Sequence, residues 1–134
     1  MTYTICYVSK ALNDLSQNQV EEIFQTTQQN NSKRNIHGIL MYGMGDFFQV
    51  LEGEEKVIEE LFEDHIKLDP RHTDIFEIIR RPTQQPIFSE YSSVFSIVRT
   101  EEQLEDIKTY LAINKLNTTS NKLRRLLNPF LLEL

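Results

Sequence analysis

The sequence is poor in the residues that build disulfides and metal centres. It has one cysteine, Cys6, no tryptophan and three histidines, at positions 37, 65 and 72. A single cysteine excludes an internal disulfide and a multi-cysteine metal site. The histidines lack a metal-ligand spacing such as HExxH. We therefore expect no metal cofactor.

Long apolar runs and an excess of positive charge are also missing. No segment reaches the roughly 18 apolar residues that a membrane-spanning helix needs. The start, MTYTICYVSK, lacks the basic and apolar segments of a signal peptide, so we expect a cytoplasmic protein. With 20 acidic against 14 basic residues the net charge is −6. Because binding to phosphates needs a basic face, we expect neither nucleic acid nor a membrane as a partner.

What is present is the pattern of one α+β domain. The 134 residues are enough for one hydrophobic core and too few for two. Strand-like and helix-like segments follow one another in the order βαββαββ, which is the ferredoxin-like arrangement with one extra strand and two helices on one face of the sheet. The expected strands are 2–8, 36–42, 46–53, 74–81 and 91–98, and the expected helices begin at Ser16 and close to Glu54.

Two more helical segments follow the fifth expected strand. The sheet face opposite the first two helices, bearing Phe48, Val50 and Val94, requires a cover. We therefore expect residues 1–98 to form the domain and residues 99–134 to form a C-terminal helical extension. This extension packs on the other face of the sheet or on a partner.

The expected strand DFFQVLEG carries a polar residue on its apolar face. Alternation places Gln49 on the same side as Phe47 and Leu51. A buried amide group without a partner costs about 1–3 kcal/mol, so a polar group must meet it. Tyr7 faces the same way in the usual strand register, and Asn31 can supply a second amide. A Tyr7–Gln49 hydrogen bond that serves stability alone, with Asn31 capping a turn, is the alternative.

The sequence around these residues resembles the BLUF domains, blue-light sensors that use flavin. The resemblance covers roughly residues 2–98 and rests on the segments TICYVS, NNSKRNIHGILMYGMGDFFQVLEG and DPRH. The spacing NNxxxxIxGxLxYxxGxFxQxLEG holds throughout residues 30–53. The chain is similar to the short BLUF proteins that carry two extra helices and act through a partner or an oligomer.

The resemblance implies a role for each matching residue. It makes Tyr7 the photoactive tyrosine, Gln49 the switching glutamine and Asn31 the asparagine that binds the ring of FAD or FMN. A phenol can give up an electron and then a proton, and a glutamine amide offers both a donor and an acceptor, so it can reverse its hydrogen bonds by rotating or tautomerising. The flavin-binding residues expected from the resemblance are Tyr7, Ile23, Phe24, Asn30, Asn31, His37, Gln49, His65, Lys67 and Arg71.

Three positions depart from the family pattern. A Trp-x-Met motif of many members is replaced by Tyr91 and Ser93, which puts the expected route of signal transmission in doubt. An arginine that often contacts the flavin phosphate is replaced by His65, with one residue inserted before it; Lys67 and Arg71 are the other cations close in sequence. His37 stands where the family has a threonine, a position expected to lie close to the ring.

These features predict a flavin-binding blue-light photoreceptor that is a sensor and not an enzyme. Its expected partners are the flavin, a downstream protein and further copies of the chain. A light-insensitive ferredoxin-like interaction module is the main alternative. A small acylphosphatase-like hydrolase is a weaker one, because Arg71 and Asn31 lie far apart in sequence and no glycine-rich phosphate loop is present.

Overall fold

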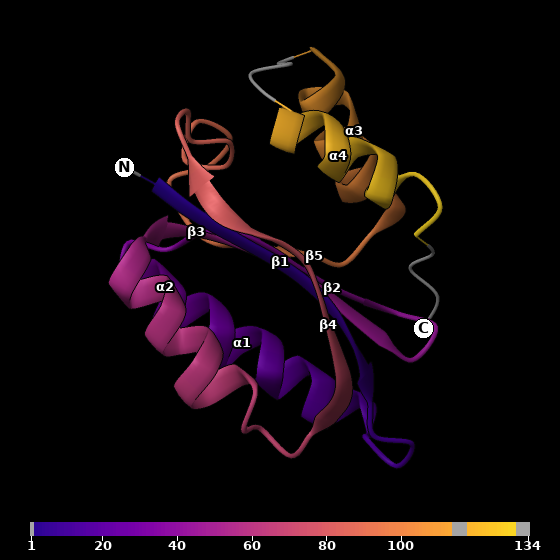
Figure 1. Ribbon diagram of the computed structural model, residues 1–134. Helices are drawn as coiled ribbons and strands as arrows, with labels where there is room; N and C mark the ends of the chain where they lie inside the picture. The colour runs from indigo at the N-terminus through magenta and orange to yellow at the C-terminus, as the bar shows by residue number, and fades with distance from the viewer. Residues whose placement is uncertain (1, 114–117, 131–134) are drawn as a thin grey trace.

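A computed structural model of the chain describes residues 2–113 and 118–130. It has a five-stranded sheet in the order β4-β1-β3-β2-β5, with helices on both faces (Figure 1). In chain order the elements are β1 (Thr2–Ala11), α1 (Gln17–Lys33), β2 (His37–Gly43), β3 (Asp46–Glu54), α2 (Glu55–Leu61), the π-helical turn η1 (Phe62–Ile66), β4 (His72–Thr83), β5 (Ser96–Val98), α3 (Glu101–Ile113) and α4 (Thr118–Leu127).

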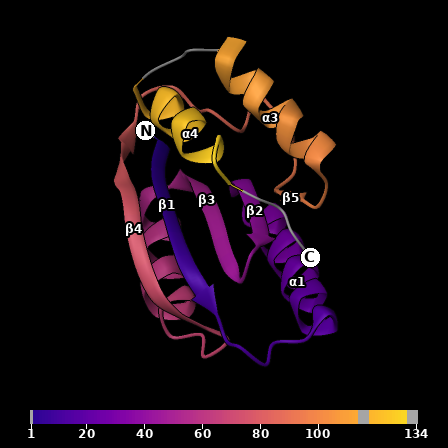
Figure 2. The same cartoon turned by 90° about the vertical axis from the view of Figure 1, so that its right-hand side faces the viewer.

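The molecule has three layers. Helices α1 and α2 cover one face of the sheet, and α3 and α4 cover the opposite face, as the two views in Figures 1 and 2 show. The predicted ferredoxin-like sheet, with C-terminal helices on its second face, is confirmed. None of the helices within the described ranges is long and apolar enough to cross a membrane.

Strand pairing places β1 and β3 at the centre of the sheet. β1 pairs antiparallel with both β3 and β4, and β2 pairs antiparallel with β3 and parallel with β5. Tyr7 and Gln49 are direct partners in the β1–β3 register. Two side chains on the central strands are therefore brought face to face across one ladder.

Alternation along the strands divides the interior into two cores. On β3, Phe47 and Leu51 point toward α1 and α2, whereas Phe48 and Val50 point toward α3 and α4. The core that contains Phe48 and Val50 is closed by buried residues of the C-terminal helices, namely Leu104, Ile107, Leu111, Leu123 and Leu127. The cover expected from residues 99–134 is present over the described part of that segment.

The fifth strand is shorter than the sequence indicates. The prediction placed it at 91–98, but β5 contains only Ser96–Val98, and residues 91–95 form a turn and an irregular approach to it. Val94 is 47% exposed, so the prediction that it lies on the covered face of the sheet is wrong. Phe95 is the buried residue of this approach, and it packs in the core under α1 and α2.

Gly38 sets how closely β2 approaches β3. Its φ is +138°, a backbone conformation that residues with a Cβ rarely adopt. A Cβ at this position would lie 1.9 Å from the carbonyl oxygen of Val50. Glycine therefore permits the register in which Leu40 is the partner of Gln49 on the other side of β3.

Candidate functional site

The centre of the site is a hydrogen bond between two buried side chains of neighbouring strands. The amide Nε2 of Gln49 donates to the hydroxyl oxygen of Tyr7 at 2.5 Å. The two residues are 4% and 3% exposed. The polar residue on the apolar face of β3 thus has the partner that the strand register predicts.

Two polar atoms beside this pair have no partner. Within the described residues, Oε1 of Gln49 and Nδ2 of Asn31 are buried and make no hydrogen bond. Asn31, at the end of α1, is 2% exposed. Such orphaned groups cost about 1–3 kcal/mol each, so a native protein that keeps them has another use for them. One is an acceptor and the other a donor, which together suit a ligand that carries both N–H and C=O groups.

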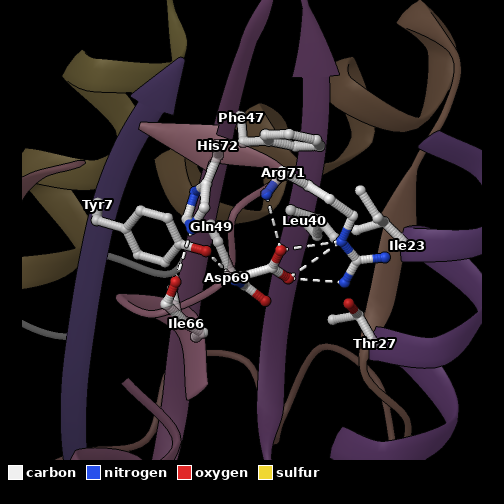
Figure 3. A pocket seen from close by; sticks show the side chains of 10 residues that line it. All are labelled: Tyr7, Ile23, Thr27, Leu40, Phe47, Gln49, Ile66, Asp69, Arg71 and His72. Carbon is white, nitrogen blue, oxygen red and sulfur yellow. Dashed lines mark hydrogen bonds and ion pairs between the residues drawn. The ribbon is translucent and has the colours of Figure 1, made fainter. Parts of the chain in front are cut away.

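The orphaned atoms belong to residues that line two adjoining pockets between the sheet and the α1/α2 layer. We treat these pockets as two lobes of one cavity because both are lined by Thr27, Gln49, Ile66 and Asp69. The first lobe encloses about 70 Å³ and the second about 140 Å³. Figure 3 shows the first lobe, which is lined by Tyr7, Ile23, Thr27, Leu40, Phe47, Gln49, Ile66, Asp69, Arg71 and His72. The second lobe is lined by Thr26, Thr27, Asn30, Asn31, Gln49, Leu61, His65, Ile66 and Asp69.

An ion pair stands in the first lobe. The carboxylate of Asp69 accepts from Nη2 of Arg71 at 2.7 Å and from its Nε at 3.0 Å, and Figure 3 shows this pair near Ile23 and Thr27 of α1. These bonds from Arg71 lower the pKa of Asp69 and raise the pKa of Arg71. Even taken together, the two lobes are smaller than the about 300–1,000 Å³ typical of ligand pockets, so a flat ring system needs both lobes and a displaced Arg71.

Burial controls the protonation of Tyr7. Loss of solvent raises its pKa strongly, and the nearby Asp69 carboxylate raises it further, against a lowering effect of the Gln49 hydrogen bond. Tyr7 is therefore a neutral phenol at neutral pH. Its ring packs against Phe62 at 5.5 Å between centroids and, edge-on, against His72 at 6.2 Å.

The structure brings most of the predicted ligand residues to this cavity. Seven of them line a lobe: Tyr7, Ile23, Asn30, Asn31, Gln49, His65 and Arg71. Phe24, His37 and Lys67 do not line either lobe. The flavin contacts expected of these three residues stay predictions that the lining does not support, and each placement has a physical cause.

Phe24 and His37 point elsewhere because of the geometry of their elements. Consecutive helix residues differ by about 100° in direction, so Thr27, four residues after Ile23, shares its face while Phe24 does not. The Phe24 ring is instead covered by the guanidinium of Arg99, 5.1 Å from its centroid. His37 precedes Gly38 and lies in a separate hollow, which it lines together with Glu52.

Lys67 is held outside the cavity by acidic neighbours. Its Nζ lies 3.1 Å from the carboxylate of Glu63 and 3.8 Å from that of Glu77. The same carboxylates pair with Arg80, which lies 2.5 Å from Glu63 and 3.5 Å from Glu77. This exposed cluster joins η1 to β4 and leaves Lys67 with no role in the lining.

A π-helical turn lies at the place where the resemblance implies one residue inserted before His65. Helix α2 continues at Phe62 into η1, whose wider turn absorbs one extra residue without breaking the helix. His65 and Ile66 both reach the second lobe from this turn. π-Helical turns occur often at functional sites, which agrees with the position of η1 beside the cavity.

Several lining residues were not singled out from the sequence. Leu40 and Phe47 could have been found, because strand pairing places them on the same face as Gln49. Asp69 and His72 lie in the segment DPRH, in which only Arg71 was selected. Ile66 had no signal in the sequence, because its place depends on the π-helical turn.

Tyr91, one of the two predicted signal-transmission residues, lies on the opposite side of the sheet from the cavity. The Tyr91 ring packs on Tyr110 of α3 with centroids 4.9 Å apart, and Ser93 is exposed. Neither lines the cavity described above. Tyr91 therefore contacts the C-terminal helices, whereas Ser93 does not pack in either core.

A buried carboxylate fixes the segment that leads to Tyr91. Glu52, 1% exposed at the end of β3, accepts hydrogen bonds from the backbone N–H groups of Ile87, Phe88 and Ser89 at 2.6, 2.9 and 3.1 Å. The hydroxyl of Tyr110 donates to the carbonyl of Ile87 at 2.5 Å. Strand β3 is thus joined to α3 through one short chain of hydrogen bonds.

Comparison with known proteins identifies relatives of this arrangement. The family model BLUF, described as sensors of blue-light using FAD, matches residues 2–94. A photoactivated adenylate cyclase subunit beta from Euglena gracilis is 31% identical over 113 residues, which is 81% of this chain and 13% of the relative. The chain thus spans about an eighth of the length of that curated relative.

Two solved structures are similar to the whole fold. The photo-activated state of BlsA matches with a TM-score of 0.70 and 26% identity, and the match covers 100% of both chains. Klebsiella pneumoniae BlrP1 with FMN and cyclic diGMP matches with a TM-score of 0.73 and 25% identity, over 96% of this chain and 35% of that one.

Proposed function

The chain belongs to the BLUF family, the flavin-using sensors of blue light, and on that premise we propose that its two-lobed cavity seats the flavin and that Tyr7 and Gln49 form the light-driven switch. The observation that carries this proposal is the pair of orphaned atoms beside the Tyr7–Gln49 hydrogen bond. BLUF domains are sensory modules, so we propose a receptor role and no catalysis for this chain.

The residues around the cavity fit a flavin ring. The ring carries carbonyl oxygens and an N–H along one edge, which match the free donor of Asn31 and the free acceptor of Gln49. Ile23 and Leu40 supply apolar contact in the first lobe. Seating the ring requires the Arg71 side chain to leave the lobe, which is feasible because that side chain is 40% exposed.

Arg71 lines the first lobe and His65 lines the second, and both side chains carry N–H groups that can donate hydrogen bonds. We propose that they contact the phosphate-bearing tail of FAD or FMN. The proposal places Asn30, exposed at the rim of the second lobe, beside the same tail.

Tyr7 and Gln49 have the chemistry that the switch needs. A bound oxidised flavin absorbs blue light and, once excited, is a strong oxidant. Tyr7 gives an electron and then its hydroxyl proton, and both return to it within one photocycle, so the lasting change is confined to the amide. A half-turn or tautomerisation of Gln49 replaces the present N–H···O contact by a bond in which the Tyr7 hydroxyl donates to Gln49.

The output is proposed to run through the sheet to the C-terminal helices. Residues 1–98 form the sensor and residues 99–134 the output extension, with Glu52 and Tyr110 along the connecting hydrogen bonds. Light shifts the relative affinity for a downstream protein or for further copies of the chain. Such coupling is typically worth about 1–3 kcal/mol.

The absorption spectrum of the purified protein tests this function. We expect bound flavin and a small, reversible red shift of its absorption under blue light. Protein that takes up no flavin when FAD, FMN or riboflavin is added would contradict the proposal. Bound flavin without any shift would support the light-insensitive alternative instead.

A further inference from the structure

The His72 ring is held at both of its nitrogens. Its Nδ1 lies 2.7 Å from the hydroxyl oxygen of Ser9 on β1, and its Nε2 lies 2.7 Å from the backbone carbonyl oxygen of Ile66 at the end of η1. Ser9 is 2% exposed and His72 is half-buried, so the two hydrogen bonds are partly shielded from water. One imidazole thus ties the start of β4 to a second strand and to the π-helical turn.

The partners determine which nitrogen carries the proton. A carbonyl oxygen only accepts hydrogen bonds, so Nε2 of His72 must be the donor to Ile66. A hydroxyl can donate or accept, so Ser9 adapts to either state of Nδ1. The geometry therefore requires a proton on Nε2 and excludes the neutral tautomer that has its only proton on Nδ1.

Ile66 is the residue through which this bond reaches the switch. Ile66 and Gln49 both line the first and the second lobe, so the Gln49 amide turns in a space that Ile66 bounds. The His72 ring also packs edge-on against Tyr7, at 6.2 Å, and against Phe47, at 6.3 Å. Figure 3 shows His72 beside Tyr7 with Ile66 bonded below it.

We propose that His72 is a positioning residue that sets the lifetime of the light-adapted state. Its Nε2–H holds the backbone of Ile66 in place, and a close-packed wall that cannot give way raises the barrier for the Gln49 amide to turn back. This inference rests on the proposed function, because it concerns the return step of the same switch. It adds that the rigidity of the backbone at Ile66, and not the Tyr7–Gln49 pair alone, controls the rate at which the light-adapted state returns to the dark state.

Matched amide substitutions separate the two nitrogens. In His72→Gln the amide nitrogen reaches the place of Nε2, so the bond to Ile66 is retained and the recovery rate stays within about twofold of wild type. In His72→Asn the shorter amide reaches only the Nδ1 position; the lost hydrogen bond speeds recovery roughly fivefold or more. Ser9→Ala removes the other partner, and we expect recovery within about twofold of wild type.

The measurement is the dark recovery of the flavin absorption after a blue pulse, with the size of the shift recorded for each variant. Equal recovery of wild type and His72→Asn would overturn the inference, as would a His72→Gln variant as fast as His72→Asn. A missing shift in wild type would instead contradict the proposed function itself.

Nitrogen NMR of the wild-type imidazole rings provides a readout that does not depend on the variants folding. The His72 signals, assigned as those absent from either His72 variant or by connectivity, should report a protonated Nε2. A proton on Nδ1 alone would overturn the inference.

Discussion

Gln49 and Glu52 lie three residues apart on β3 and face opposite sides of the sheet. Gln49 meets Tyr7 under the α1/α2 layer, and Glu52 holds the backbone of residues 87–89 under α3 and α4. A displacement of β3 at Gln49 is therefore connected, through Glu52, to the segment that packs under α3 and α4. This relationship underlies the first two predictions.

Replacing Tyr7 by phenylalanine should abolish the light-induced red shift while flavin stays bound. The substitution removes the electron and proton donor and the partner of the Gln49 amide but keeps the buried ring. Tyr42→Phe is the matched control, because Tyr42 packs on Phe47 without lining either lobe. A shift of full size in Tyr7→Phe would remove Tyr7 from the mechanism.

Replacing Glu52 by glutamine should leave the red shift intact and uncouple the C-terminal helices. An amide accepts fewer of the three backbone N–H groups, which should lower the free energy of unfolding by about 1–3 kcal/mol. Hydrogen exchange of α3 in the dark and under blue light measures the coupling. We expect a light-dependent difference in wild type and a reduced one in Glu52→Gln; equal differences would exclude this path.

Gln49→Leu should also abolish the shift, because leucine has about the volume of glutamine without a donor or acceptor. It leaves the Tyr7 hydroxyl without its partner, so the free energy of unfolding should fall by about 1 kcal/mol or more. Difference spectra and urea unfolding measure the two effects. Gln28→Leu, which removes an amide bonded to the Phe95 carbonyl away from the cavity lining, is the control and should keep the shift.

Asn31→Ala should weaken flavin binding by roughly tenfold, the effect of losing one well-aligned hydrogen bond to the ring. The orphaned Nδ2 of Asn31 is the observation behind this expectation. Titration of the flavin-free protein with FMN, followed by fluorescence quenching, measures the affinity. Asn13→Ala, a change of an exposed loop residue, should bind as wild type does; unchanged binding by Asn31→Ala would contradict its assignment.

Asp69 should contribute to stability only above the acid range. Its pKa is lowered in the folded state by the Arg71 hydrogen bonds, so the contribution is complete above its ordinary pKa of 3.8 and is lost as the pH falls through the lower folded value. Urea unfolding of wild type and Asp69→Asn between pH 2 and 6 measures it. We expect the two midpoints to differ near pH 6 and to converge at the acid end; a constant difference would contradict the ion pair.

The fold and the Tyr7–Gln49 hydrogen bond could be predicted from the sequence, because strand and helix patterns are local and the ferredoxin-like order of the elements implies which strands pair. Alternation and the β1–β3 register suffice to bring Tyr7 and Gln49 together. The capping-box pattern at Ser16 and Gln19 likewise marks the start of α1.

The placements that could not be predicted from the sequence are those that depend on tertiary packing. Ile23 and Phe24, which are neighbours in α1, were both expected to contact the ring, but only Ile23 lines the first lobe. His37 was placed by sequence proximity to the site, but strand geometry directs it to another hollow. The fifth strand was overestimated because buried Phe95 continues an apolar run that the sheet does not extend.

Because η1 is a π-helical turn, changing the number of residues in this segment is a way to re-engineer the receptor. Deleting one residue from 62–66 would convert the π-helical turn into an ordinary α-helical one and keep the residues after it in phase with α2. An arginine introduced at the position of His65 could then be tested in the shorter turn beside the second lobe. A change of a single codon would thus alter the geometry with which this turn contacts the flavin.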